Sequence, residues 1–251
     1  MIEPSGKRPV IQPGVVATLL LGSGFCALVY QVAWLRLLRL IFGASTASNA
    51  AVLAIFMGGL GLGGLLLGPR ADKHKNPLLL YSWLELIIAG LAILSPYLVL
   101  LARNAYIAAG GTLALGPVLG TTLKLLLSTI VLGGPTFLMG GTLPAAVRAV
   151  QTNEDPNRNS LALVYGANTI GAVAGAFLAT FVFLEAFGIR TCLLLAALMN
   201  IVVALIARNL SRGASVPLPK NEPVVETRPT VEADNLPSHP AILVAAALVG
   251  F

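Results

Sequence analysis

The chain has 251 residues, of which 57% are hydrophobic and only 10% are charged. A soluble domain carries charge on about one quarter of its residues, so this composition excludes an ordinary soluble protein. The net charge of +6 does not indicate nucleic-acid binding, because the basic residues lie in turns between apolar runs. Cys26 and Cys192 lie inside apolar runs, and the sequence shows no disulfide framework, metal-ligand spacing or cofactor motif.

Six apolar runs are each long enough, at roughly 20 residues, to cross the hydrocarbon layer as a helix. We therefore expect an all-α polytopic membrane protein, with a cytoplasmic leader at 1–13 and a six-helix transmembrane domain at 14–207. The sequence predicts an outside loop at 103–119, with an interfacial helix within it as an alternative, and a polar turn at 148–160. The helices are expected at 14–40, 45–68, 78–101, 120–144, 161–185 and 189–207.

The composition changes after the sixth run. Residues 208–239 combine prolines with mixed charge and lack periodicity, which is typical of a disordered cytoplasmic linker. Apolar sequence resumes at 240 and runs to 251. About eleven residues cannot span a bilayer, so we interpret this segment as the start of a truncated seventh helix, with further helices expected beyond it.

The basic residues predict the orientation of the bundle. Short cytoplasmic loops collect Lys and Arg. If the N-terminus is cytoplasmic, eleven of the sixteen cations fall on the inner side and five on the outer side. The sequence therefore predicts that both ends are cytoplasmic, in a membrane of the bacterial inner (plasma) type, with the lipid bilayer as the main partner.

The second run is rich in glycine and ends in a charged turn at 69–76. Glycines four residues apart let a neighbouring helix approach closely, and a second such pair lies in the fifth run. The expected packing glycines are Gly59, Gly63, Gly64, Gly68, Gly171 and Gly175. The expected cytoplasmic turn motif is Gly68, Arg70, Asp72 and Lys73.

Three polar side chains are expected about 10 Å inside the cytoplasmic boundary, as estimated from the helical rise of about 1.5 Å per residue. They are Glu85 in the third helix, Asn168 in the fifth and Asn200 in the sixth. We expect a shared polar layer, with the hydroxyl of Tyr165 as a further member. Its role is either a substrate, proton or cation site around Glu85, or simple interhelical hydrogen bonding by the asparagines.

A second polar cluster is expected at the outer end of the bundle. It comprises Gln31, Arg36, Arg39 and Lys124. These residues are too distant in depth to pair with Glu85. The cations are interpreted as side chains that reach the membrane interface while their stems remain in the apolar region.

Five stretches together resemble the membrane part of membrane-fused spermidine synthase-like proteins: 23–38, 56–63, 84–86, 135–144 and 165–172. The resemblance implies a membrane bundle followed by a cytoplasmic aminopropyltransferase-like domain, which would bind decarboxylated S-adenosylmethionine and a polyamine. That soluble catalytic domain would be a partner outside this chain. We therefore expect no cofactor and no catalytic residue in this chain, and no catalytic activity from it alone.

The membrane part of that family is also similar to half of a major facilitator superfamily transporter, and residues 68–73 are similar to the turn between its second and third helices. Two functions follow from these resemblances. One is a module that anchors a spermidine synthase-like protein and passes a polyamine-type substrate. The other is half of a secondary transporter with Glu85 as a coupling or cation site, and a plain structural anchor is a third possibility.

Overall fold

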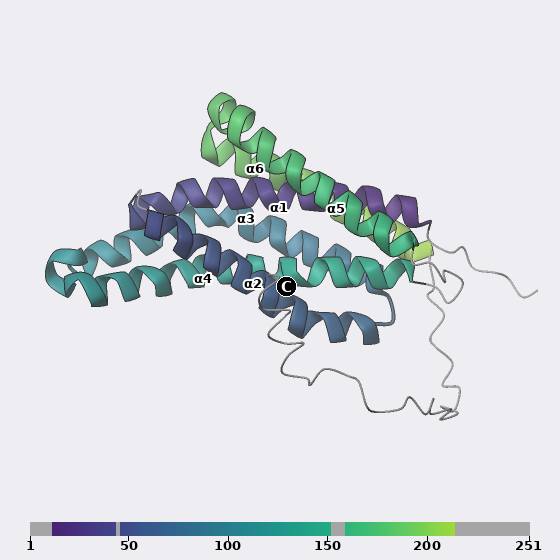
Figure 1. Ribbon diagram of the computed structural model, residues 1–251, viewed down its shortest axis with the longest axis horizontal. Helices are drawn as coiled ribbons and strands as arrows, with labels where there is room; N and C mark the ends of the chain where they lie inside the picture. The colour runs from purple at the N-terminus through teal and green to yellow at the C-terminus, as the bar shows by residue number, and fades with distance from the viewer. Residues whose placement is uncertain (1–11, 44–45, 152–158, 214–251) are drawn as a thin grey trace, which may run out of the picture. The chain divides into compact units, whose positions relative to one another are not determined.

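The computed structural model describes residues 12–43, 46–151 and 159–213 of the chain. All secondary-structure elements in these residues are helices, and Figure 1 shows them along the chain. Most of the expected leader and linker, and all of the expected seventh helix, lie outside the described residues. The elements are α1 (Pro13–Phe42), α2 (Thr46–Lys73), α3 (Pro77–Ala108), α4 (Gly111–Val150), α5 (Asn159–Leu178), the π-helical turn η1 (Ala179–Phe183) and α6 (Leu184–Gly213).

The prediction of an all-helical fold with membrane-length helices is confirmed for the described residues. Five helices there are long and apolar enough to cross a membrane: Pro13–Arg39, Asn49–Lys73, Pro77–Ala108, Gly111–Val150 and Asn159–Gly213.

The fifth of these helices contains a sharp break. It is 55 residues long, and a straight helix of that length would extend about 80 Å, far beyond a hydrocarbon core of about 30 Å. At Gly188 the backbone leaves helical geometry, with φ 73° and ψ 170°. Figure 1 accordingly shows α5 and α6 as two arms. A positive φ of this size is readily adopted by glycine, which has no Cβ.

Several expected boundaries are wrong. The predicted outside loop at 103–119 is largely helical, because α3 continues to Ala108 and α4 already begins at Gly111. The turn there is made by glycines with positive φ, Gly110 and Gly111, and a further kink lies at Gly116. The glycines and the lower apolar content of this stretch indicated a loop, but a stretch less apolar than a membrane span can still be helical, because alanines favour a helix in either environment.

Two charged helix ends also extend further than predicted. Residues 69–73, expected in the charged turn, form the last turn of α2, and residues 208–213, expected in the linker, form the end of α6. The last turns carry Arg70 and Lys73 in α2 and Arg212 in α6. Cations stabilise the negative end of the helix dipole, so these basic residues favour continued helix.

Helices α2 and α4 are in close contact along small residues. A Cβ added to Gly63 would overlap the carbonyl oxygen of Phe137, and one added to Gly140 would overlap the carbonyl oxygen of Leu60. One turn earlier, a Cβ on Gly59 would overlap the side chain of Thr136. Glycine is therefore required where the two backbones touch, as in other close helix pairs in membranes.

Helices α1 and α5 form a second close pair. A Cβ on Gly171 would overlap the carbonyl oxygen of Leu21, and one on Gly24 would overlap the carbonyl oxygen of Asn168. One turn further along, a Cβ on Gly175 would overlap the backbone of Phe25. The second pair of expected packing glycines thus lies at an interhelical contact.

The two close pairs have the same reciprocal geometry. In each pair, a glycine of one helix faces the carbonyl three residues before the facing glycine of the other helix. The paired residue numbers rise together, so both pairs are parallel. Because the contacts in each pair are reciprocal, either helix of one pair can be superposed on either helix of the other.

Helix α3 packs against α4 and α6 and also contacts α1. Along α6, Asn76 donates to the carbonyl of Ser211 and Ser82 donates to the carbonyl of Ala204, so these two helices are antiparallel. Contacts of α3 with α4 also run in opposite directions, from Leu91 with Gly134 to Tyr106 with Gly120. Hydrogen bonds between α1 and α3 rise together, from Leu19 with Tyr81 to Trp34 with Ser95, so these two helices are parallel. Combined with the two close pairs, these contacts make successive long helices alternate in direction.

Candidate functional site

A buried carboxyl group lies at the contact of α1, α3 and α6. Glu85, on α3, is only 1% exposed. The hydroxyl of Ser23, on α1, donates a hydrogen bond of 2.5 Å to Glu85 Oε1. The hydroxyl of Tyr81, one turn earlier on α3, also lies near this carboxyl and donates to the carbonyl of Leu19 at 3.3 Å. Helices α1 and α3 therefore meet here through polar groups.

Helix α6 closes the other side of this cluster. Asn200 is 1% exposed, and its Nδ2 donates to the backbone carbonyl of Glu85 at 3.0 Å. Its Oδ1 has no hydrogen-bond partner within the described residues. A buried amide oxygen without a hydrogen-bond donor costs free energy. Oδ1 of Asn200 is therefore an open acceptor beside Glu85.

No Lys, Arg or His of the described residues forms an ion pair with Glu85. Its carboxyl is surrounded by the neutral groups of Ser23, Tyr81 and Asn200. Carboxyl groups in the interior of a membrane bundle are rare, and in transporters they mark proton and cation sites. The arrangement offers a carboxyl and an amide oxygen to a small cation, a proton or one ammonium group. We define Glu85, Ser23, Tyr81 and Asn200 as the Glu85 cluster.

The polar layer expected from the sequence is only partly assembled. Asn200 adjoins Glu85, but neither Asn168 nor Tyr165 hydrogen-bonds to any member of the Glu85 cluster within the described residues. Asn168 faces α1 at Gly24, and Tyr165 is 49% exposed. Since Gly24 directly follows Ser23, Asn168 lies at the same level along α1 but on another face of that helix.

The sequence pattern did not predict Ser23 and Tyr81 as members of this site. Serine and tyrosine are common in membrane helices, so neither residue is distinctive by type. Tyr81 lies four residues before Glu85, which places both side chains on one face of α3. That spacing is the signal that could have identified Tyr81, whereas Ser23 comes from another helix and has no such signal.

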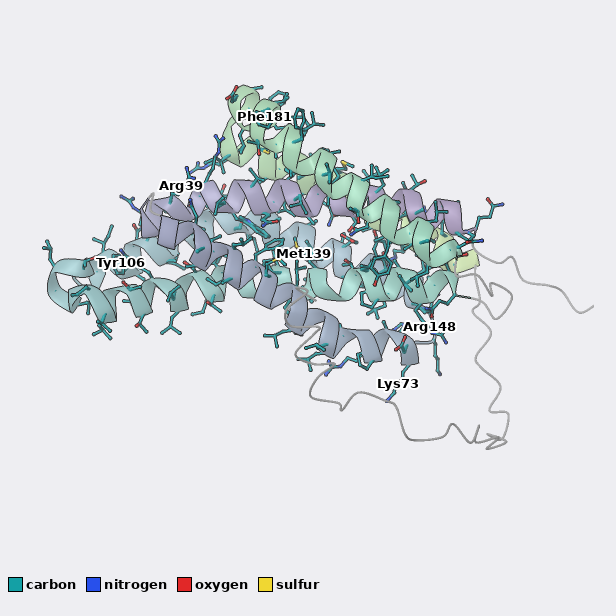
Figure 2. All side chains as sticks on the ribbon, viewed as in Figure 1. Arg39, Lys73, Tyr106, Met139, Arg148 and Phe181 are labelled. Carbon is teal, nitrogen blue, oxygen red and sulfur yellow. The ribbon has the colours of Figure 1, made fainter. Side chains whose placement is uncertain are left out.

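The residues of the expected outer cluster are not joined to one another by hydrogen bonds or ion pairs within the described residues. Arg36 and Gln31 are half-buried on α1, and Arg39 is exposed. Lys124, on α4, instead places its Nζ 5.0 Å from the ring centroid of Tyr106 on α3, a cation–π contact. Figure 2 shows Arg39 and Tyr106 near one end of the helices and Arg148 near the other.

The expected turn motif lies at the end of α2 that is opposite the outer cluster. Arg70 Nη1 donates to the carbonyl of Leu66 in its own helix at 2.8 Å, while Asp72 and Lys73 are exposed. Gly64 and Gly68 are the two expected packing glycines nearest this turn. A Cβ added to Gly64 would be in ordinary van der Waals contact with the carbonyl oxygen of Gly140. A Cβ added to Gly68 would meet only the ring of Pro144, at a looser distance than those at Gly59 and Gly63.

No group of three or more metal-ligating side chains is present among residues 12–43, 46–151 and 159–213. Comparison of the chain with protein families, with curated proteins and with solved structures found no match.

Proposed function

We propose that this chain is the integral membrane module of a spermidine synthase-like protein. The observation that carries this proposal is the location of the five stretches that resemble that family. The stretch 23–38 contributes Ser23 to the Glu85 cluster, and 84–86 contributes Glu85 itself. The stretches 56–63 and 135–144 meet in the α2/α4 pair, and 165–172 meets 23–38 in the α1/α5 pair. The resembling residues therefore include the close contacts of both helix pairs and the buried carboxyl group.

The proposed module crosses the membrane six times, with the two arms of Asn159–Gly213 counted as separate crossings. The alternating helix directions support this count, because six crossings return the chain to its starting side. The excess of cations in the leader, at the end of α2 and after α4 and α6 supports cytoplasmic ends. We place the module in a membrane of the bacterial inner type on the same grounds.

In this proposal the module anchors a soluble aminopropyltransferase-like domain and passes its polyamine-type substrate or product. A polyamine is a flexible chain of ammonium groups, and each ammonium needs acceptors when it leaves water. Glu85 and the open Oδ1 of Asn200 offer acceptors for one such group. The catalytic step belongs to the soluble domain, so residues 1–251 alone are expected to transfer no aminopropyl group.

Radiolabelled spermidine binding to the purified chain in proteoliposomes tests this role. We expect saturable binding that Glu85→Gln reduces at least tenfold, because the variant keeps the shape of the side chain and removes its charge. Glu185→Gln is the matched control, because Glu185 is an exposed carboxyl group near the start of α6. Equal binding by both variants, or no saturable binding by the unmodified chain, would leave only an anchoring role.

A second candidate function is half of a major facilitator-like secondary transporter. It is favoured by the equivalent geometry of the two close helix pairs, which is compatible with a match of α1–α2 with α4–α5 in opposite orientation. Inverted three-helix repeats of this kind occur within each half of such transporters. The downstream reading frame separates the two candidates. A glycine-rich strand–turn–helix with paired aspartates favours the first, and six further membrane helices followed by a stop favour the second.

A further inference from the structure

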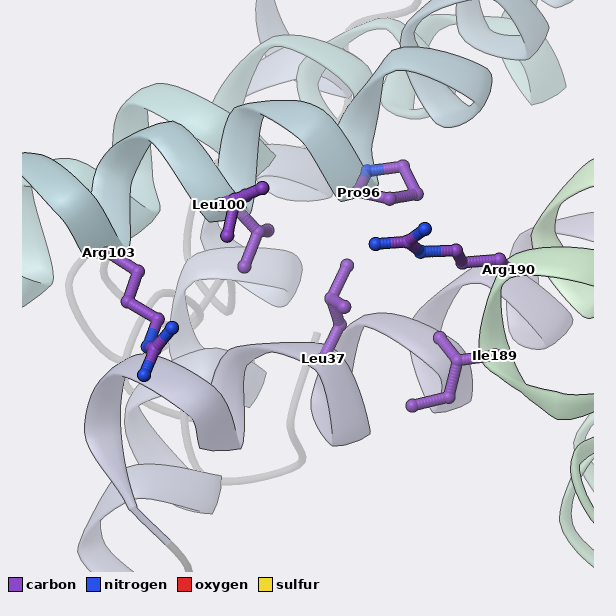
Figure 3. Close-up of a pocket in the computed structure, with 7 residues that line it drawn as sticks. Leu37, Pro96, Leu100, Arg103, Ile189 and Arg190 are labelled. Atoms are coloured by element: carbon purple, nitrogen blue, oxygen red, sulfur yellow. The ribbon is translucent and has the colours of Figure 1, made fainter.

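A cavity of about 270 Å³ opens between α1, α3 and α6, at the end of the helices away from the Lys73 end of α2. Its apolar lining includes Leu37 of α1, Pro96 and Leu100 of α3, and Ile189 of α6. Two arginines complete the lining, Arg103 and Arg190. Figure 3 shows their guanidinium groups on opposite sides of Leu37, with that of Arg190 directed toward Pro96.

Neither guanidinium group is neutralised by a neighbour in the part of the chain that the structure describes. Within the described residues, Arg103 and Arg190 form no hydrogen bond and no ion pair, and both side chains are exposed. Glu185 is the one described carboxylate near this end, and it is not part of the cavity lining. Two further arginines of α1, Arg36 and Arg39, precede and follow Leu37. The local charge is therefore strongly positive.

The backbone adds to this positive charge. The chain breaks at Gly188, so a new helical segment begins at Ile189. The first turn of a helix carries amide groups without acceptors in that helix and the positive end of its dipole. Both Ile189 and Arg190 line the cavity, which places this positive helix end beside it.

We propose that the cavity binds a phosphate group. Guanidinium groups bind phosphate oxygens through paired hydrogen bonds, which makes arginine well suited to such a site. Basic pockets between membrane helices on the cytoplasmic side hold the head groups of anionic lipids, and this cavity offers the same chemistry at the other end of the helices. Leu37, Leu100 and Ile189 form an apolar wall that an acyl chain can cover, so the phosphate belongs either to an anionic phospholipid or to a soluble phosphate. This site is separate from the Glu85 cluster and does not depend on the proposed function.

Binding to the purified full chain in detergent tests the proposal with three probes: short-chain phosphatidylglycerol, short-chain phosphatidylcholine and inorganic phosphate. Native mass spectrometry counts bound lipid, and a titration gives the apparent affinity of each probe. We expect phosphatidylglycerol to bind more tightly than phosphatidylcholine. Binding of phosphatidylglycerol without phosphate identifies a lipid site, and competition by phosphate identifies a site that also accepts a soluble anion.

The double variant Arg103→Gln/Arg190→Gln is expected to weaken binding of the anionic probe at least tenfold, because two charge-assisted contacts are lost. Arg212→Gln is the matched control, since Arg212 is exposed in the last turn of α6 at the opposite end of that helix. The double lysine variant keeps both charges and should retain binding within a few fold of the unmodified chain.

Leu100→Trp keeps the arginines and fills the cavity, so it should also weaken binding, and it tests the site if the double glutamine variant fails to fold. Three results would overturn the proposal. One is equal binding by the double glutamine variant and Arg212→Gln. Another is unchanged binding by Leu100→Trp, and the third is no preference of the unmodified chain for either anionic probe.

Discussion

The close contact of α2 with α4 makes a quantitative prediction for a single added methyl group. Gly61 and Gly63 lie two residues apart in α2, but a Cβ on Gly61 meets nothing within 4 Å. A Cβ on Gly63 overlaps the carbonyl oxygen of Phe137 and lies 3.1 Å from the Cα of Gly140. Alanine is favoured over glycine in a helix by about 1 kcal/mol, so Gly61→Ala should stabilise the protein by up to that amount.

At Gly63 the same gain in helix propensity is opposed by overpacking. Added methyl groups in packed interiors cost about 1–3 kcal/mol. The atoms in the way belong to the backbone of α4 and cannot rotate aside, so the upper part of this range applies. Gly63→Ala should therefore be less stable than the unmodified chain by about 2 kcal/mol, and less stable than Gly61→Ala by about 3 kcal/mol.

The assay is unfolding in mixed micelles by titration with a denaturing detergent, followed by the loss of tertiary signals. Gly171→Ala provides a repeat in the α1/α5 pair, with Gly166→Ala as its control, because a Cβ on Gly166 also meets nothing within 4 Å. If Gly63→Ala proves as stable as Gly61→Ala, the close approach of the two backbones is refuted.

Three further predictions use the same described contacts. Ser23→Ala removes the hydroxyl donor to buried Glu85 and should cost about 1–3 kcal/mol of unfolding free energy, whereas Ser82→Ala removes a donor to a helix carbonyl and should cost about 0.5–1.5 kcal/mol. Detergent unfolding measures both, and a larger cost at Ser82 would contradict the importance of the Glu85 cluster. Trp34→Phe removes the bond of 2.8 Å from Trp34 Nε1 to the hydroxyl of Ser95 and should cost about 1 kcal/mol, measured in the same titration; an unchanged midpoint would contradict it. In a chain whose two cysteines are replaced by alanine, Ala109→Cys should react with an impermeant maleimide added to intact cells, and Lys75→Cys should react only after permeabilisation; the reverse pattern would refute the proposed orientation.

The sequence identified the membrane helices well because their signal is local. A run of apolar residues that is about 20 residues long reports its own preference for lipid, whatever its neighbours are. Helix ends were predicted less well. At 103–119 and 208–213 the sequence is less apolar, yet both stretches are largely or wholly helical. Leaving the hydrocarbon region and ending a helix are different events, and hydropathy reports only the first.

For the Glu85 cluster, too, the sequence predicted a property of each helix alone but not the contacts between helices. Counting residues along each helix placed Glu85, Asn168 and Asn200 at similar depth, and depth follows from helical rise alone. Of the two asparagines, Asn200 hydrogen-bonds to Glu85, whereas Asn168 faces Gly24 on another side of α1. The rotation of each helix about its axis decides which side chains meet, and that rotation is set by packing with its neighbours.

By itself, the sequence determined that the chain forms membrane-length helices, and it located four of the glycines at which a partner helix comes close, Gly59, Gly63, Gly171 and Gly175. Tertiary structure alone decided that α4 is the partner of α2 and that α5 is the partner of α1. It also decided that Ser23 completes the Glu85 cluster and that Arg103 and Arg190 share one cavity. The physical reason is that lipid tails and neighbouring helices are almost equally apolar, so hydropathy cannot distinguish a helix face that meets lipid from one that meets protein.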